Sequence, residues 1–447
     1  MGIDAGFDMV PRLSSGANDQ QKWEAFIEDV KHHFEGDPVF RVHDNYIEFE
    51  SGEYPMLPLQ GHKVLRFSSK LCRGVDPYIF GVTSLASKHF GSRVRKWVDG
   101  FDERYHYDWN EVNESWKLYD QPDQSQPDSE LSTSLFEIHD VPLKGRGLVA
   151  KYDISIGTRI ICEEPILLAQ NMSPGILEAV LATKLKALSK EKQRQFLSLR
   201  NNYPGKYPFG GIFRTNSLPC GSGASTGGIY PTICLINYSC SPNAHNNWSD
   251  EAKHETIHAV RPIRAGEEIT ISYDRGQPFV ARKAFLKTSF GFECACHVCT
   301  LPRAEREASD NRRMQIDELD TSIGNPINMM RNPKKSLTDC YSLLHIVEEE
   351  HGEYSVPLKA RLYYDAFQIC IAHGDLARAC VFAERAYDAR AVCEGEDSPE
   401  TRRMKSFALN PRWHSTFGAY SMKWKSKKED RPIGSNEEGF EKWLFRQ

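Results

Sequence analysis

Gly228-Ile-Tyr-Pro-Thr-Ile-Cys-Leu-Ile-Asn-Tyr-Ser-Cys240 and Gly291-Phe-Glu-Cys294-Ala-Cys296-His-Val-Cys299 are the two most unusual stretches of this chain. The second stretch carries a Cys-x-Cys-x2-Cys spacing, which supplies three corners of a tetrahedral zinc site. A structural zinc is held by four protein ligands, so the fourth must come from elsewhere in the chain. Cys240 is the best candidate because it lies in the other unusual stretch. The sequence therefore predicts that zinc ties a short flap onto a polar turn, with a pocket between them.

Four motifs follow one another in the middle of the chain. They are Gly145-Arg-Gly147, Asn237-x-Ser-Cys-x-Pro-Asn243, Gly266-Glu-Glu-Ile-x-Ile-x-Tyr273 and the cysteine triplet. Each motif is weak alone, but their order within one domain is specific. The chain resembles SET-domain methyltransferases with a post-SET zinc segment, and it is most similar to the SMYD branch and its fungal relatives. The resemblance is strong from Leu135 to Thr300 and looser to about Arg403.

The chain departs from true SMYD proteins because it lacks their MYND zinc finger. Such a finger needs about seven or eight Cys and His ligands at paired spacing. Between Ile166 and Ile229 there is a single cysteine, Cys220. We therefore expect one structural zinc, and whatever partner recruitment the finger supplies must come from another part of the chain.

The resemblance and the residue pattern together predict an α+β protein, with a SET-domain β-fold at its centre. A polar run from Asp120 to Ser129, interrupted twice by Pro, is the clearest linker. From about Arg303 the pattern is helical, and a Gly374-Asp375 turn between two amphipathic helices resembles a tetratricopeptide repeat. The expected units are an N-terminal α+β module of unknown role (17–118), a linker (119–132), the SET domain (133–275) with a helical insert (about 171–227), the post-SET zinc segment (276–302), a helical TPR-like region (303–410) and a tail (411–447).

The composition is that of an ordinary globular protein and narrows the classes of function. Hydrophobic residues make up 40% of the 447 residues, charged residues 26%, and the net charge is −5, so no global basic field draws the chain to nucleic acid. We see no signal peptide and no apolar run of membrane-spanning length. Twelve cysteines in so long a chain are far fewer per residue than in a disulfide-rich secreted domain. A reducing compartment, nucleus or cytoplasm, is therefore expected.

Methyl transfer from S-adenosylmethionine requires a place for the cofactor, a neutral nucleophile and an in-line geometry. Glycines on both sides of Arg146 let the backbone turn tightly and approach a ligand closely, although a plain hairpin turn has the same pattern. The resemblance implies that Asn237 and the backbone of Tyr238 hold the cofactor, and that Phe292 stacks on its adenine. The full set of expected cofactor-binding residues is Lys144, Gly145, Arg146, Gly147, Asn216, Asn237, Tyr238, Tyr273 and Phe292.

Tyr273 is the expected catalytic residue, because it ends a strand as the family's tyrosine does. Its hydroxyl can accept weak C–H···O contacts from the transferring methyl group and orient the incoming amine. The acceptor should be a lysine amine, which an apolar channel keeps neutral by desolvation. Tyr230 and Phe290 are expected to line this channel. Phe290 departs from the family, where a tyrosine is common at this place, so the product degree and the acceptor stay open.

Three functions remain compatible with the sequence. The leading one is a protein-lysine methyltransferase that acts on a lysine-containing peptide or a histone tail. The second is a catalytically silent SET domain that acts as a scaffold, and the third is a methyltransferase for another amine. Asn237, Tyr273 and Phe292 argue for activity, whereas Tyr238 in place of a histidine argues weakly against it. The C-terminal helical region is a possible site for a further protein partner.

Overall fold

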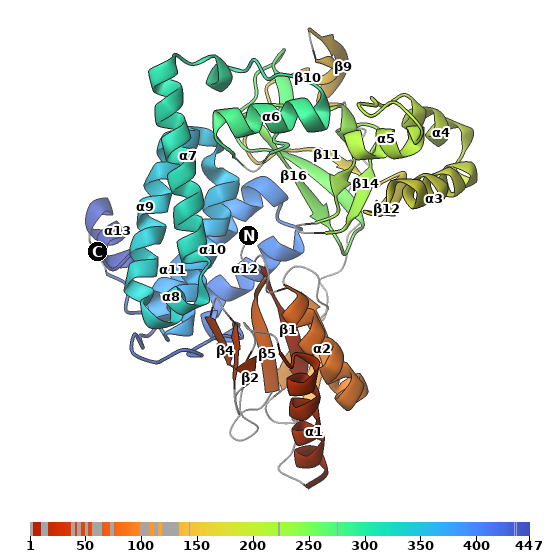
Figure 1. Cartoon of the computed structure of the whole chain (residues 1–447). Helices are drawn as coiled ribbons and strands as arrows, with labels where there is room; N and C mark the ends of the chain where they lie inside the picture. The colour runs from red at the N-terminus through yellow and green to blue at the C-terminus, as the bar shows by residue number, and fades with distance from the viewer. Residues whose placement is uncertain are drawn as a thin grey trace.

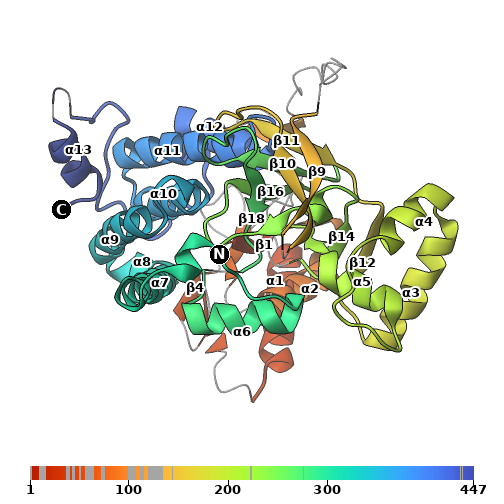
Figure 2. The same ribbon diagram turned by 90° about the horizontal axis from the view of Figure 1, so that it is seen from above.

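The computed structural model describes residues 3–9, 17–36, 41–42, 46–49, 52–55, 65–71, 76–98, 107–110, 115–118, 134–142, 144–221, 224–274, 276–432, 434 and 436–447. The expected linker at 119–132 lies outside these residues. Figures 1 and 2 show the central strands with the C-terminal helices on one side and the helices α3 and α4 on the other. Within the described part of the chain, no helix is both long and apolar enough to cross a membrane.

The N-terminal elements form a small sheet with two helices. The strand β1 (Ile3–Met9) lies between β5 (Leu65–Leu71) and β6 (Val94–Val98) and pairs antiparallel with both. The start of this module was expected at residue 17, whereas the structure has β1 before that residue. The strand was not predicted because its glycine and two aspartates interrupt the apolar pattern of a strand. The remaining elements here are α1 (Ala17–His33), α2 (Asp76–Phe90), β2 (Arg41–Val42), β3 (Tyr46–Phe49), β4 (Gly52–Pro55), β7 (Tyr107–Asn110) and β8 (Ser115–Leu118).

Three small sheets enclose the central core. In the first, the order is β15-β18-β10-β9, and the pairing of β15 with β18 is parallel. The other two sheets have the orders β11-β17-β16 and β12-β14-β13. The bounds are β9 (Phe136–Val141), β10 (Gly145–Ala150), β11 (Arg159–Glu163), β12 (Leu167–Gln170), β13 (Leu218–Pro219), β14 (Thr226–Ile229), β15 (Asn237–Tyr238), β16 (Ala244–Ser249), β17 (His254–Ala259) and β18 (Glu268–Ile271).

The parallel pair is what places the site. Asn237 lies opposite Thr270 and Tyr238 lies opposite Ile271, so two motifs far apart in the sequence run side by side. The chain leaves β18 directly into Tyr273. The expected helical insert consists of α3 (Pro174–Ala187), α4 (Lys190–Leu197) and α5 (Pro208–Asn216), which pack around a buried cluster of leucines and phenylalanines.

The C-terminal region is helical, as the sequence predicts. Ala366, Ala379 and Ala383 are fully buried between α10 and α11, where small side chains let the two helices approach closely. Gly374 makes the turn at a positive φ of 81°, and the Asp375 side chain accepts the Arg378 backbone N–H to cap α11. The helices are α7 (Arg303–Ile323), α8 (Pro326–Arg331), α9 (Pro333–His351), α10 (Val356–Ala372), α11 (Leu376–Glu394), α12 (Pro399–Leu409) and α13 (Glu437–Leu444).

Several contacts attach this helical region to the central domain, among them the following two. The helix α11 packs against β16 and β17, where Val260, Ala360 and Cys393 form a small buried cluster. At the other contact, α6 (Phe279–Phe290) begins after a proline and has no cap from its own preceding residue. The Asp310 carboxylate on α7 accepts the Phe279 N–H at 2.6 Å instead. The helix that leads into the cysteine flap is therefore capped by the C-terminal region.

We predict that Asp310→Ala lowers the free energy of unfolding by about 1 kcal/mol, because the first turn of α6 loses its acceptor. Asp310→Asn keeps an oxygen at this place and should retain most of the stability. Denaturant titration of both variants measures the difference. Equal stabilities of the alanine and asparagine variants would show that the cap contributes nothing.

Candidate functional site

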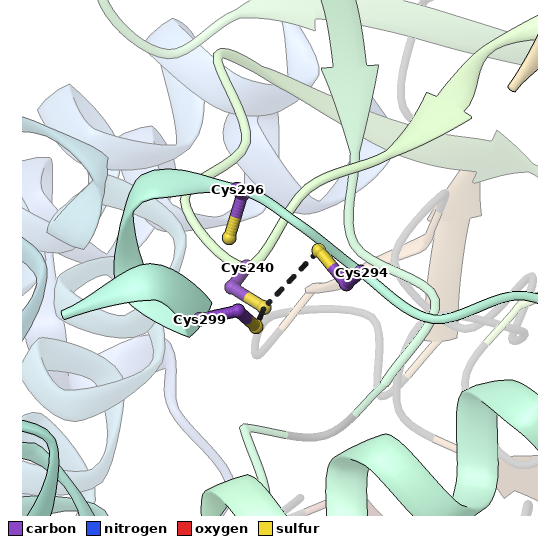
Figure 3. Close-up of side chains that lie close together, drawn as sticks. All are labelled: Cys240, Cys294, Cys296 and Cys299. Atoms are coloured by element: carbon purple, nitrogen blue, oxygen red, sulfur yellow. Dashed lines mark hydrogen bonds between the residues drawn. The ribbon is translucent and has the colours of Figure 1, made fainter. Parts of the chain in front are cut away.

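Four cysteine thiols converge where the chain leaves α6. Their sulfur atoms all lie within 4.8 Å of one another, and Figure 3 shows Cys240 meeting the other three from a separate segment. The Cys240 sulfur is 3.4 Å from that of Cys299 and 3.9 Å from that of Cys294. Sulfurs around a tetrahedral zinc, at the usual Zn–S distance of about 2.3 Å, lie about 3.8 Å apart. The four thiols therefore have the spacing and the chemistry of a zinc site, while His297 is exposed.

A buried cation lies beside these thiols. Arg282, on α6, is 1% exposed. Burial by itself lowers the pKa of its guanidinium, but the charge at Cys240 and a hydrogen bond with Cys299 raise that pKa above its usual value. The Tyr238 hydroxyl is 3.3 Å from the Cys240 sulfur and donates to the Asp274 carboxylate at 2.9 Å. Because four thiolates around one divalent metal carry a net negative charge, a neighbouring guanidinium offsets part of it.

Aromatic rings connect the thiol cluster to the expected catalytic tyrosine. Tyr273 lies 5.4 Å from Tyr238 and 4.8 Å from Phe290, measured between ring centroids. Phe292 lies 6.0 Å from Tyr238 and 6.4 Å from Phe290. Tyr238 lies on β15, Tyr273 follows β18, Phe290 ends α6 and Phe292 lies on the flap. Together the four rings form one apolar wall. The structure thus brings Phe290 and Phe292 to Tyr273.

The flap is also tied to the helical insert. Gly291 ends α6 at a positive φ of 73°, a conformation that favours glycine. The Asn202 side-chain amide donates to the Phe290 carbonyl at 2.5 Å, and the Tyr203 hydroxyl donates to the Ser289 carbonyl at 2.9 Å. The position of Phe290 therefore depends on contacts from the segment that follows α4.

Tyr273 directs its hydroxyl to a backbone carbonyl. The hydroxyl donates to the Ile236 carbonyl at 2.5 Å, and the side chain is half-buried. Burial, with the nearby Cys234 and Glu268, raises the pKa of Tyr273 above its usual value, so the phenol is neutral. A phenol whose proton is already donated has only its lone pairs to offer a ligand. The Tyr273 oxygen is thus arranged as an acceptor.

The Gly-Arg-Gly loop and Asn237 form one hydrogen-bonded unit through Glu268. The Asn237 amide donates to the Glu268 carboxylate at 2.9 Å and to the Arg146 carbonyl at 3.2 Å. Lys144 forms an ion pair with the same carboxylate at 2.5 Å. A Cβ atom at Gly147 would come within 2.6 Å of the Asn237 nitrogen, so a larger residue here would displace the Asn237 side chain. Gly145 adopts a positive φ of 81°.

Two further contacts position this unit against the insert. The Arg146 guanidinium donates to the Ser198 carbonyl at 2.7 Å, at the end of α4. The Asn216 amide, at the end of α5, donates to the Arg200 and Ile212 carbonyls, both at 2.7 Å. Both amide hydrogens of Asn216 are therefore used within the fold, which leaves its oxygen as the atom able to meet a ligand.

The prediction that Tyr230 lines the substrate channel is wrong. Its side chain is 0% exposed and belongs to the central core. Its hydroxyl lies 3.4 Å from the Glu255 carboxylate and 4.0 Å from the Cys220 sulfur. The residue follows β14 directly, and its ring fills the space between the sheets. The sequence around Tyr230, from Gly228 to Asn237, does not indicate that this side chain points into the core.

Sequence reasoning also missed three residues that shape the site. Glu268 was quoted within its motif without a role, yet it joins Asn237 to Lys144. The sequence could have indicated this role, because Glu268 lies two residues after Gly266, at the start of the strand that was expected to lie near Asn237. Arg282 and Asp274 contact the thiol cluster and Tyr238, and their spacing in the sequence gave no indication of it.

The buried Glu255 predicts a distinct dependence of stability on pH. Burial raises the pKa of Glu255 to about 7 from an ordinary value of 4.5, although hydrogen bonds from Asn246 and Tyr230 oppose the shift. A raised folded-state pKa gives a stabilisation that is complete below pH 4.5 and lost as pH rises to about 7. Relative to Glu255→Gln, the wild-type protein should lose about 3 kcal/mol of unfolding free energy over this interval. Denaturation of both proteins across the range tests this, and a constant difference would contradict it.

Comparison with known proteins gives a consistent picture. Residues 145–274 match the sequence family described as SET domain. The protein named histone-lysine N-methyltransferase set5 from Schizosaccharomyces pombe is 35% identical over 286 residues, which cover 63% of this chain and 86% of that protein. The human protein named histone-lysine N-methyltransferase SMYD3 is 40% identical over 73 residues, which cover 16% of this chain and 17% of that protein.

Solved structures give a weaker likeness. The SET domain of LSMT bound to lysine and AdoHcy covers 63% of this chain and 88% of its own chain, with 14% identity and a TM-score of 0.26.

Proposed function

This chain belongs to the SET-domain family of protein-lysine methyltransferases, and from that premise we propose which of its residues carry out the transfer. S-adenosylmethionine supplies a methyl group on an already reactive sulfonium, so the protein mainly positions and desolvates. The proposal rests above all on the Tyr273 hydroxyl, which donates to the Ile236 carbonyl and keeps its lone pairs for the reacting centre.

We assign cofactor binding to the unit formed by residues 144–147 and Asn237. The loop offers backbone groups beside Gly147, where a Cβ atom would displace the Asn237 side chain, and Glu268 fixes both the lysine and the amide. Asn216 contributes its free oxygen from the end of α5. Phe292 lies on the flap, where its ring can cover an adenine. A site of this composition provides polar groups for a charged amino acid end and an aromatic face for a base.

We assign positioning of the acceptor to Tyr273 and Phe290. The acceptor lysine must lose its proton before it attacks, and apolar surroundings favour the neutral amine because they desolvate the charged form. The rings of Phe290 and Tyr238 supply such surroundings next to the Tyr273 oxygen. That oxygen accepts C–H···O contacts from the transferring methyl group, a role that a neutral, hydrogen-bonded phenol fits.

The proposed protein substrate is a histone, since the S. pombe relative is named for that activity, and a non-histone protein is the alternative. A histone substrate would place the protein in the nucleus. Incubation with tritiated cofactor, first with histones and then with cell extract, distinguishes the two. A wild-type protein that labels neither would contradict the proposed function.

We also propose that the four converging cysteines hold one structural zinc. The sulfur spacing supports this, and so does Arg282, whose buried guanidinium lies beside Cys240 and Cys299 and can offset the charge of thiolates. The metal would hold Phe290 and Phe292 in place without contacting the cofactor.

Tyr273→Phe should lower kcat by about 10- to 100-fold while the affinity for S-adenosylmethionine stays near wild type, because only a transition-state contact is removed. Tyr152→Phe, at an exposed tyrosine, is the matched control and should leave kcat unchanged. Calorimetry gives the affinity and methyl transfer to a peptide gives kcat. The wild-type rate should rise with pH as the acceptor lysine deprotonates. Full activity of Tyr273→Phe would reduce this residue to a packing role.

The purified protein should carry one zinc per chain by elemental analysis. Cys240→Ser should lose that metal, because the tetrahedral set is incomplete, and its affinity for S-adenosylmethionine should fall as the flap is released. Cys220→Ser is the matched control, since Cys220 lies in the core beside Tyr230 and should not affect the metal. A Cys240→Ser protein with undiminished zinc would refute the four-cysteine assignment.

A further inference from the structure

A separate pocket lies at the end of the C-terminal helical region. Its volume is about 310 Å³, and its lining includes Lys334, Arg378, Trp424, Lys442, Trp443 and Arg446. These residues come from α9, α11, α13 and the segments before and after α13. Figures 1 and 2 show α13 on the side of the molecule opposite α3 and α4. The pocket therefore shares no residue with the methyl-transfer site.

Two of the cations in this pocket are held rigidly by one buried carboxylate. Asp375 is 0% exposed and accepts hydrogen bonds from both Arg378 and Arg446. Each guanidinium also stacks on a tryptophan, with Arg446 4.1 Å from the Trp424 ring centroid and Arg378 4.5 Å from that of Trp443. Arginines fixed in this way present planar N–H donors whose conformational entropy is already restricted.

The backbone at Arg446 supports a role for its side chain. Arg446 has a φ of 56°, in the left-handed region that favours glycine at the end of a helix. A non-glycine residue in that conformation costs free energy, and such residues cluster at functional positions. The Arg446 side chain is 24% exposed, so part of its guanidinium faces the pocket.

The charges around the pocket do not balance. The pocket lining contains four cations, Lys334, Arg378, Lys442 and Arg446, and their ion-pair partners among the described residues are two carboxylates, Asp375 and Glu438, of which Glu438 pairs with Lys442 at 2.6 Å. The side chains thus carry an excess of two positive charges. Lys334 is exposed and has no ion-pair partner in the described part of the chain.

We propose that this pocket binds the phosphate of a phosphorylated serine or threonine side chain in a protein partner. A phosphate monoester carries nearly two negative charges at neutral pH, which matches the excess, whereas a carboxylate carries one. Guanidinium groups bind phosphate oxygens through paired hydrogen bonds. The tryptophans supply an apolar wall for the adjacent methylene and backbone. The site recruits a phosphorylated partner on a face remote from methyl transfer.

The test uses the full chain and fluorescence anisotropy. The probes are a labelled peptide library with a fixed phosphoserine, the same library with serine, and the same library with glutamate. The phosphoserine library should bind at least tenfold more tightly than the other two. Arg446→Gly removes the guanidinium and relieves the strained φ, and Lys334→Gln removes an exposed charge, so both variants should fold. Each should weaken phosphoserine binding about tenfold or more.

Lys186→Gln, an exposed lysine on α3, is the matched control and should bind like the wild type. The pocket variants should retain methyl transfer to an unphosphorylated substrate, which shows that the catalytic domain is intact. Equal binding of the serine and phosphoserine libraries, absence of binding, or wild-type binding by both pocket variants would overturn the proposal. Equal binding of the glutamate library would assign the site to carboxylates, and displacement by inorganic phosphate without peptide binding would assign it to a free anion.

Discussion

The meeting of the Cys240 thiol with three thiols of the flap is the contact on which the rest of the site depends. The segment from Gly291 to Thr300 has few apolar side chains in the core, because Val298 is its only buried residue. Apolar packing therefore contributes little to holding it in place. The thiol cluster holds this segment against the turn after β15. Phe292 then lies beside Tyr238, and Phe290 beside Tyr273. The arrangement of the aromatic rings thus depends on the thiol cluster, although the cysteines lie several residues away from the rings.

The C-terminal helices take part in the same arrangement. Asp310 caps α6, and the buried ion pair of Arg313 with Glu350, at 2.7 Å, joins α7 to α9 close behind it. Breaking such a buried pair is costly because it leaves an uncompensated charge. The helix that carries Arg282 is therefore fixed at its start by α7 and at its end by the insert. The helical region does more than present a surface to partners, since it supports the flap.

Much of this was accessible from the sequence, for a physical reason. Cysteine spacing, the Asn237 turn and the strand that precedes Tyr273 encode local geometry within a few residues. The α10–α11 pair was found from the same kind of local pattern. Tyr230 was assigned to the channel, and Glu268 and Arg282 were given no role, because the partners of these residues come from other strands and helices. An alternating or helical pattern predicts that a residue is buried. Whether its side chain then lines a channel or packs in the core depends on long-range packing, which the local pattern does not encode.

Arginines are held in fixed positions beside the thiol cluster and in the C-terminal pocket, and the sign of the surplus charge differs between the two places. Beside the thiol cluster the surplus would be negative when the proposed metal is bound by four thiolates, and the Arg282 guanidinium would offset part of it. Around Asp375 the surplus is positive, since one carboxylate holds two guanidiniums. A buried carboxylate shared in this way fixes the arginines without neutralising them. A fold whose net charge is −5 thus keeps a local cationic pocket, because rigid pairing, and not total composition, determines where an anion is attracted.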